Sequence, residues 1–374
     1  DLNKKKLSIN QFWKYEEKYH FFKKNNQYSK KNFDNLLKNE IEKELISDVP
    51  VGTFMSSGLD STLVTSIAST FKKDMQVYSI GYEDKNFDES EQAYKISNYL
   101  DIKFNKILFK FSDVPSLFEE LTDRLDLPHT DQSDLPLYLL CKNAKKNGSK
   151  VILTGDGGDE LFGGYNRHIW GKNILEMNSL IKIPINFILK YKLIISTIEF
   201  LNNLLPRKYF QLDLKSKILK FSKLLKYKNL NDIYLFLLKN NNESDLIELF
   251  YDKDMSNLRN MMKYDFQFYL PNNVLYKSDR CSMYNSIEIR APLLSKNIIE
   301  YSLCMQDRNI VNNFQGKLIL RKVLRKYLPD SLIQSKKSGF SIPLAKWIRG
   351  PLNDWAKNIF FDPIITKNYL IKVF

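Results

Sequence analysis

The sequence is poor in cysteine, with only three in 374 residues. Cys141, Cys281 and Cys304 form no CxxC pair and lack the spacing of metal ligands, so neither a zinc cluster nor a disulfide framework is expected. No secretory signal pattern opens the sequence. These features fit a reducing compartment, and we expect a cytoplasmic protein.

The sequence also lacks a long uninterrupted hydrophobic run. Its most apolar region, residues 181–205, is broken by Pro184, Lys190, Lys192 and Glu199. Because a membrane-spanning helix needs about 20 predominantly apolar residues, this region predicts a buried amphipathic helical segment. We expect no membrane partner.

Dense arginine clusters are missing as well, although the formal net charge is +14 and the isoelectric point is about 9.3. The excess comes from scattered lysines, a pattern typical of solvated faces. A nucleic-acid surface would need clustered basic residues, so no nucleic-acid partner is expected. With 43% hydrophobic residues over this length, the chain can build two domains or one large one.

Apolar strand patterns alternate with amphipathic helix patterns between residues 50 and 155, which predicts a parallel sheet covered on both faces. After about residue 170 the strand pattern disappears, and this part is expected to be mostly helical. Strands are predicted at 49–55, 75–82, 102–109 and from 149. Helices are predicted at 32–47, 60–71, 89–101, 113–126, 135–148, 234–240, 245–251, 296–305 and 316–328.

The stretch GTFMSSGLDS at 52–61 follows the first predicted strand and opens a helix. Ligands of parallel sheets bind at the carboxyl ends of the strands, and small residues let backbone N–H groups approach an anion there. Asp60 fits either the first turn of a helix or a ligand of Mg²⁺ on a pyrophosphate. Since no lysine follows the glycine, this is not a GK[ST] phosphate loop. The stretch alone leaves open an ordinary turn or a phosphate loop.

A second loop, LTGDGGDELFGGY at 153–165, places Asp156, Asp159 and Glu160 near the end of another strand. Like charges held this close need a cation or hydrogen bonds to offset their repulsion. A Mg²⁺ ion shared by Asp60 and Asp159 would offset this repulsion. The alternative is an acidic turn that caps a helix.

The first loop resembles the SGGxDS loop of the ATP pyrophosphatase (PP-loop) superfamily, with Ser57 in place of the first glycine. Over residues 45–350 the chain resembles the synthetase domain of the glutamine-hydrolysing asparagine synthetases, a group that includes β-lactam synthetase. The matching motifs are SDVPVGTFMSSGLDST, YSIGYED, LTGDGGDELFGGYNR, LPNNVLYKSDRCSMYNSIEIRAPLL, KLILRKVLRKYLPDSLI and KKSGFSIPLAKWI. The resemblance implies a doubly wound α/β fold of the adenine nucleotide alpha hydrolase type.

This resemblance also implies the domain organisation. Residues 1–30 are expected to be a linker from an upstream glutaminase domain, 31–170 the ATP-binding α/β part, and 171–374 the helical part of the synthetase domain, truncated at its end. The expected partners are this glutaminase domain, small-molecule substrates and, as an option, a second copy in a homodimer. Free ammonia, not glutamine, is the nitrogen source expected for the chain itself.

The implied reaction is an AMP-forming amide ligation that uses ATP and Mg²⁺. A carboxylate, L-aspartate in the first reading, is adenylated and then attacked by ammonia, which gives asparagine, AMP and pyrophosphate. The alternative is an asparagine-synthase-like amidotransferase acting on another carboxylate, such as a sugar acid of surface-polysaccharide biosynthesis. An RNA-binding PP-loop enzyme or a basic binding module would need an appended domain, arginine-rich surfaces or sulfur chemistry, which the sequence does not show.

The resemblance assigns roles to individual residues. Asp60 and Asp159 are the expected Mg²⁺ ligands, and Asp156 and Lys337 the expected catalytic residues. Asp156 replaces the usual glutamate, and Ser335 stands where arginine is common. The expected ATP-binding residues are Met55, Ser56, Gly58, Asp60, Ser61, Ile80, Thr154 and Gly155. Substrate-side or supporting roles fall to Glu160, Lys277, Asp279, Arg280, Glu288 and Arg290, with an ion pair suggested between the last two.

Overall fold

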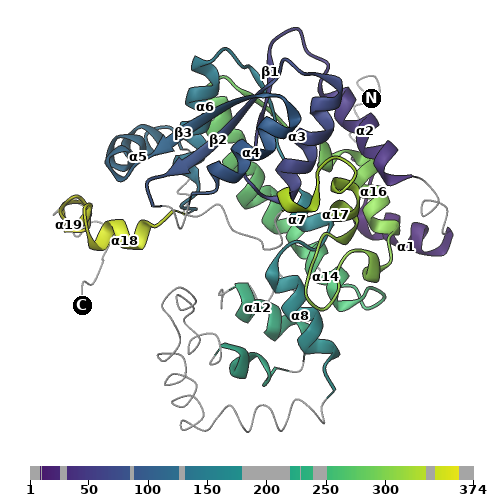
Figure 1. Cartoon of the computed structure of the whole chain (residues 1–374). Helices are drawn as coiled ribbons and strands as arrows, with labels where there is room; N and C mark the ends of the chain where they lie inside the picture. Colours follow the sequence, from purple (N-terminus) through teal and green to yellow (C-terminus); the bar gives the residue numbers. More distant parts are fainter. Residues whose placement is uncertain are drawn as a thin grey trace, which may run out of the picture. The chain divides into compact units, whose positions relative to one another are not determined.

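The protein is described by a computed structural model (Figure 1). It describes residues 9, 11–25, 32–84, 88–125, 131–178, 220–227, 229–238, 251–333 and 342–361. The chain divides into two compact units. We call one the helical unit: Asp1–Gln27, Asp159–Phe268 and Ser302–Leu318. The other, the sheet unit, consists of Tyr28–Gly158, Tyr269–Tyr301 and Ile319–Phe374. Both units draw on segments from either side of residue 170, while the domain boundary expected there stays a prediction.

The sheet unit contains five strands, all parallel, in the order β3-β2-β1-β4-β5. Their bounds are β1 Val51–Phe54, β2 Gln76–Tyr82, β3 Lys103–Phe109, β4 Val151–Leu153 and β5 Glu288–Arg290. The first four confirm the strands expected from the sequence. The sequence pattern did not reveal β5, because its three residues, Glu-Ile-Arg, include one apolar side chain, whereas the equally short β4 is a continuous apolar run.

Helices cover both faces of this sheet, which confirms the doubly wound α/β class. Side chains of successive strand residues point to opposite faces. Thr53 faces α3, where it accepts a hydrogen bond from Thr65 Oγ1 at 3.1 Å. Phe54 lies in the core cluster that β2 and β3 form with α5 and α6. In Figure 1, β1, β2 and β3 lie beside α3 and α4 with α6 behind them.

The α-helices of this unit are α2 Phe33–Glu44, α3 Leu59–Phe71, α4 Ser90–Leu100, α5 Val114–Thr122, α6 Asp134–Lys146, α15 Tyr276–Met283, α18 Leu344–Arg349 and α19 Asn353–Phe360. Helix α17 Leu318–Leu324 begins at the last residue of the helical unit. Short 3₁₀ turns are η2 Phe111–Asp113, η5 Pro292–Leu294 and η7 Asp330–Leu332. These elements confirm the helices predicted at 32–47, 60–71, 89–101, 113–126 and 135–148.

The helical unit has no strand among its described residues. It holds α1 Tyr15–Asn25, α8 Asn166–Glu176, α12 Leu230–Leu238, α14 Asn257–Tyr264 and the 3₁₀ turn η6 Asp307–Asn309. Three elements cross the boundary between the units: α7 Gly158–Leu161, the π-helical η4 Asp265–Leu275 and α16 Lys296–Cys304. A core cluster of leucine, methionine, tyrosine and isoleucine side chains joins α12 and α14 to Ile310 and Val311.

No helix in the described ranges is long and apolar enough to cross a membrane. The amphipathic region predicted at 181–205 lies outside these ranges, as do residues 245–250 of one predicted helix.

Candidate active site

The turn after β1 is held together by its own serine hydroxyls. Gly58 N–H donates to Ser56 Oγ at 3.1 Å, and Ser56 N–H donates to Ser61 Oγ at 3.2 Å. The two hydroxyl oxygens lie 3.1 Å apart. Gly58 is the N-cap of α3, and Asp60 lies in the first turn of this helix. The sequence Ser-Ser-Gly-Leu-Asp-Ser thus forms a closed turn at the carboxyl end of a central strand.

Ser57, which replaces the usual glycine, is buried at 2% exposure. Its hydroxyl donates to Glu89 Oε2 at 2.7 Å. Glu89 immediately precedes α4, so this bond ties the turn after β1 to the start of the helix after β2. The substituted serine therefore contributes a fixed contact.

The second glycine-rich loop packs directly on this turn. A Cβ atom on Gly155 would lie 2.5 Å from Ser61 N and 2.8 Å from the Asp60 carbonyl carbon, distances that real side chains do not adopt. A Cβ atom on Gly158 would lie 2.5 Å from Cγ of Asp60. Only glycine permits the backbone approach at Gly155, and at Gly158 the missing side chain makes room for the Asp60 carboxylate. The two loops that the sequence singled out are in contact.

The Asp60 carboxylate has a cationic neighbour on α17. Burial lowers the pKa of the Arg321 guanidinium, and the charge of Asp60 opposes that shift. Sequence reasoning did not assign Arg321 a role, although it lies inside the KLILRK motif.

Of the two predicted nucleotide-holding positions, Met55 directly follows β1 and Ile80 lies within the adjacent strand β2. Met55 N–H donates to the carbonyl of Tyr78 at 3.0 Å, and both side chains are buried, at 1% and 6% exposure. Their side chains therefore belong to the core, which leaves the backbone as the part that can meet a ligand.

Asp156 is fixed by two hydroxyl groups. Thr154 Oγ1 donates to Asp156 Oδ2 at 2.9 Å, and Ser278 Oγ donates to the same oxygen at 3.1 Å. Ser278 belongs to α15, so the acidic loop after β4 is linked to the block that contains Lys277. The carboxylate is half-buried and keeps a defined orientation.

Lys277, the residue before Ser278, is held by the loop that precedes α6. Its ammonium group lies 2.9 Å from Asp131 Oδ2 and 2.6 Å from Ser133 Oγ. Burial would lower the pKa of Lys277, but the Asp131 charge and hydrogen bond, followed by the charges of Asp134 and Asp156, raise it above its usual value. Lys277 is thus a permanent cation near Asp156.

The remaining predicted residues of this block lie nearer the surface. Arg290 donates from Nε to Glu288 Oε1 at 2.6 Å and from one terminal nitrogen to the carbonyls of Glu44 and Ile46 at 2.7 and 2.8 Å. Glu288 is 59% exposed. Arg290 therefore links β5 to the end of α2.

Asp279 is 60% exposed and Arg280 is 37% exposed, with 4.0 Å between Oδ2 and the nearest guanidinium nitrogen. The Arg280 guanidinium also lies 5.5 Å from the centre of the Tyr276 ring.

In the helical unit, Asp159 is paired with a buried lysine that sequence reasoning missed. Lys317 Nζ lies 2.7 Å from Asp159 Oδ1, and Lys317 is 7% exposed. The backbone N–H of Lys317 donates to the carbonyl of Phe162 at 2.9 Å. Lys317 is the first residue of the motif KLILRK quoted above, and its place in that motif is the signal that could have drawn attention to it.

Glu160, next to Asp159, is almost completely buried at 2% exposure. Tyr165 Oη donates to Glu160 Oε1 at 2.5 Å. Burial, followed by the charge of Asp159, raises the pKa of Glu160 to about 8. This carboxyl group is therefore mostly protonated at neutral pH, which argues against a role as a permanent anion.

A buried ion pair follows the same loop. Asp265, with 0% exposure, accepts hydrogen bonds from Arg167 at 2.8 and 2.9 Å and from His168 Nε2 at 2.6 Å. Burial would raise the pKa of Asp265, but the Arg167 charge and the His168 hydrogen bond lower it below its usual value. Burial also lowers the pKa of His168. The guanidinium of Arg167 stacks 3.8 Å from the centre of the Tyr165 ring.

Lys337 and Ser335 lie outside the described residues, so the catalytic role of Lys337 stays a prediction. The roles expected of the other site residues are likewise untested. Within the sheet unit the structure brings together five of the residues predicted to bind ATP: Ser56, Gly58, Asp60, Ser61 and Gly155. Asp156 and Lys277 gather around Ser278 and Asp131 in the same unit.

A parallel sheet with helices on both faces, and two glycine-containing turns in contact at the carboxyl ends of its strands, are typical of α/β proteins that bind a ligand at those ends. A profile of the asparagine synthase family matches residues 32–372. The chain therefore belongs to the asparagine synthase family.

The chain is similar to "Asparagine synthetase [glutamine-hydrolyzing] 1" of Bacillus subtilis (strain 168), with 27% identity over 351 residues, 87% of this chain and 52% of the relative. It is also similar to "Amidase chyE" of Penicillium rubens, with 24% identity, 84% of this chain and 52% of the relative. The chain thus spans about half the length of these curated relatives.

Among solved structures, an NH3-dependent NAD synthetase from Campylobacter jejuni is matched over 71% of this chain and 96% of that chain. The identity is 14% and the TM-score is 0.27. A TM-score this low carries no weight for function.

Proposed function

We propose that this chain is an ATP-dependent, AMP-forming amide ligase domain that adenylates a carboxylate, L-aspartate first, and transfers ammonia to it. The observation that carries the proposal is the contact between the turn after β1 and the loop after β4, where Gly155 and Gly158 admit no side chain against Ser61 and Asp60. A glycine-containing turn at the N-terminus of a helix offers backbone N–H groups to an anion such as a polyphosphate. Arg321 adds positive charge beside Asp60.

The proposed reaction has two steps. A carboxylate oxygen attacks the α-phosphorus of ATP, the bond to the bridging oxygen breaks, and pyrophosphate leaves. Ammonia then attacks the acyl carbon, loses a proton, and AMP leaves with the electron pair of the carbon–oxygen bond. Both steps bring anions together, so fixed cations and oriented donors lower the barrier.

Mg²⁺ would be held by Asp60 and Asp159, and it would neutralise the charge of the departing pyrophosphate. Carboxylate oxygens are the donors that Mg²⁺ prefers. Two observations support this role. Gly158 packs against the Asp60 side chain, and Asp159 directly follows Gly158 in the chain. Lys317, at 2.7 Å from Asp159 Oδ1, holds that carboxylate in place.

A different acceptor, such as a sugar acid, is the second candidate. It is favoured by Asp156, which is one methylene shorter than the glutamate usual in asparagine synthetases and is fixed by Thr154 and Ser278. The shorter side chain leaves more room on the acceptor side. Lys277 supplies a cation close enough to act on Asp156.

The test is ATP–pyrophosphate exchange and AMP release with ammonium and a panel of carboxylates that includes L-aspartate and hexuronic acids. Asp60→Asn and Asp159→Asn should each lower exchange by at least about 100-fold, because losing a metal ligand removes several kcal/mol of charge stabilisation. The exposed Asp74→Asn serves as the control and should match the wild type. Near wild-type exchange in both site variants would contradict the Mg²⁺ assignment, and AMP release with hexuronic acids alone would favour the second candidate.

A further inference from the structure

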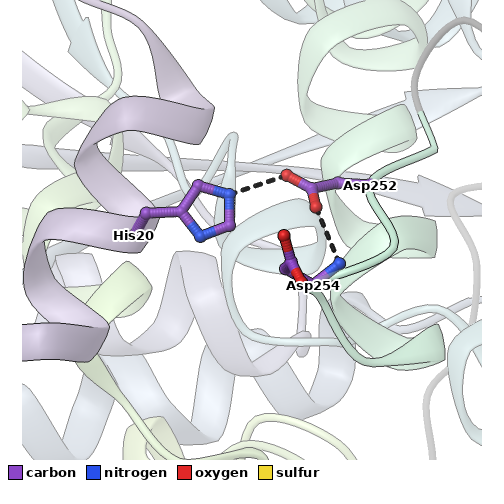
Figure 2. A group of neighbouring side chains, drawn as sticks. All are labelled: His20, Asp252 and Asp254. Carbon is purple, nitrogen blue, oxygen red and sulfur yellow. Dashed lines mark hydrogen bonds and ion pairs between the residues drawn. The ribbon is translucent and has the colours of Figure 1, made fainter.

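We propose that His20, Asp252 and Asp254 form a binding site for a divalent transition-metal ion such as Zn²⁺, independent of the function proposed above (Figure 2). One ligand atom from each side chain lies within 4.8 Å of the other two. A metal ion with bonds of about 2.0–2.2 Å separates its ligand atoms by roughly 3–4 Å. A single ion can therefore reach all three side chains with small side-chain adjustments.

The histidine comes from a helix that is firmly packed in the helical unit. His20 lies on α1, whose Tyr15 and Tyr19 are 2% and 8% exposed. Glu16 of the same helix pairs with Lys263 at 2.7 Å. These contacts fix the helix and hence the direction of the imidazole, which already contacts Asp252 Oδ2 through Nε2 at 2.9 Å.

The two aspartates come from a turn just before α14, whose backbone is equally well fixed. The buried side chain of Asn260 accepts the Asp252 N–H at 2.7 Å and donates to the Asp252 carbonyl at 2.8 Å. Asp254 N–H donates to Asp252 Oδ1 at 2.9 Å. Such supporting hydrogen bonds orient metal ligands before the ion arrives. Figure 2 shows the Asp254 carboxylate beside the His20–Asp252 pair.

The donor set selects the class of ion. One imidazole with two carboxylates suits Zn²⁺ and its neighbours in the first transition series, whereas Mg²⁺ and Ca²⁺ prefer oxygen ligands alone. A neutral imidazole and two carboxylates carry a charge of about −2, which matches a divalent cation. Lys23 Nζ, which donates to the Asp254 carbonyl at 2.9 Å, is a nearby positive charge that weakens the site.

A bound ion would connect α1 to a segment 232 residues later in the chain. The three side chains leave coordination positions for water, so the site is open on its exposed side, where Asp254 lies. A bound ion would therefore stabilise the packing of α1 against the segment before α14 within the helical unit.

The experiment is calorimetric titration of the metal-stripped full chain with ZnCl₂ in millimolar MgCl₂. One Zn²⁺ should bind per chain, and His20→Gln and Asp254→Asn should each weaken binding by about tenfold or more. Asp232→Asn, an exposed substitution in the first turn of α12, is the matched control and should leave binding unchanged. CoCl₂ should produce a visible absorption band that both site variants lose.

Zn²⁺ should also raise the melting temperature of the wild type and of Asp232→Asn, but not that of His20→Gln or Asp254→Asn. This readout does not depend on enzymatic activity. Absence of Zn²⁺ binding would reduce the cluster to an ordinary His–Asp ion pair and overturn the proposal. Equal Zn²⁺ affinity in the wild type and both site variants would place the ion elsewhere, with the same consequence.

Discussion

The sheet unit and the helical unit build their polar centres in opposite ways. In the sheet unit the two loops meet through backbone and through glycines such as Gly155, whose missing side chain lets the loops touch. In the helical unit the polar centre is a buried ion pair of Arg167 and Asp265 with His168. The first arrangement depends on the absence of a side chain, whereas the second depends on hydrogen bonds between charged side chains. Substitutions in the helical unit should therefore mainly lower the free energy of unfolding, whereas substitutions in the two loops of the sheet unit should mainly lower activity.

The largest effect on stability is expected from Asp265→Asn in the helical unit. The amide cannot accept from both partners as the carboxylate does, and it leaves the Arg167 charge buried without compensation. Removing one partner of a buried ion pair costs about 3–5 kcal/mol. The free energy of unfolding, measured by urea titration, should fall by that amount.

The control for this loss is Asp330→Asn, which removes an ion pair with Arg325 at 2.8 Å in which the aspartate is 75% exposed. Surface pairs contribute about 0–1 kcal/mol, so this variant should unfold close to the wild type. If both variants lost the same stability, burial would not be what makes the helical unit's pair strong.

A smaller loss of stability, but a larger loss of function, is expected from Gly155→Ala in the sheet unit. The added methyl group meets Ser61 N at 2.5 Å and the Asp60 carbonyl carbon at 2.8 Å, and neither backbone atom can rotate away. Overpacking of this kind costs about 1–3 kcal/mol, and a displacement of about 1 Å at the site should lower ATP–pyrophosphate exchange about 100-fold.

Gly58→Ala is the matched comparison because it lies in the same pair of loops. There the methyl group meets only the Ser56 hydroxyl, at 2.9 Å, and the N-cap backbone at φ −65° accepts any residue. Its effect on exchange should be clearly weaker. A Gly58→Ala variant as impaired as Gly155→Ala would show that the loop-to-loop contact is not the sensitive feature.

The sequence predicted the sheet unit better than the helical unit for a physical reason. The four longer or more apolar strands and the helices between them carry local periodicity, and the turn at 52–61 is a continuous stretch, so both could be recognised residue by residue. The short β5 has no such pattern. It joins the sheet through tertiary pairing with β4.

The buried centre of the helical unit was missed because its members are far apart in the sequence. Arg167 and Asp265 are separated by 98 residues, and Lys317 reaches Asp159 from a different segment. A charged residue in a helix looks the same whether it faces solvent or a buried partner. Glu160 was assigned a supporting role from its motif, but only the structure shows its burial and its bond with Tyr165.

Glu160 extends the comparison to the dependence of stability on pH. Its pKa is raised to about 8 by burial and by the charge of Asp159, against 4.5 for an ordinary glutamate. Between these values the folded protein keeps a proton that the unfolded chain releases. The contribution to stability is therefore complete below pH 4.5 and is lost as pH rises towards 8, by up to about 1.4 kcal/mol per pH unit.

Glu160→Gln should remove this dependence, because a neutral amide of the same shape replaces the protonated acid and can still accept from Tyr165. Urea unfolding between pH 5 and pH 8 should then show the stability of the variant gaining on that of the wild type as pH rises. Glu288→Gln, at a position 59% exposed, is the control and should follow the wild-type profile. Parallel profiles for Glu160→Gln and the wild type would mean that Glu160 is ionised in the folded protein. The effect of burial and of Asp159 on its pKa would then be offset by contacts stronger than the Tyr165 hydrogen bond.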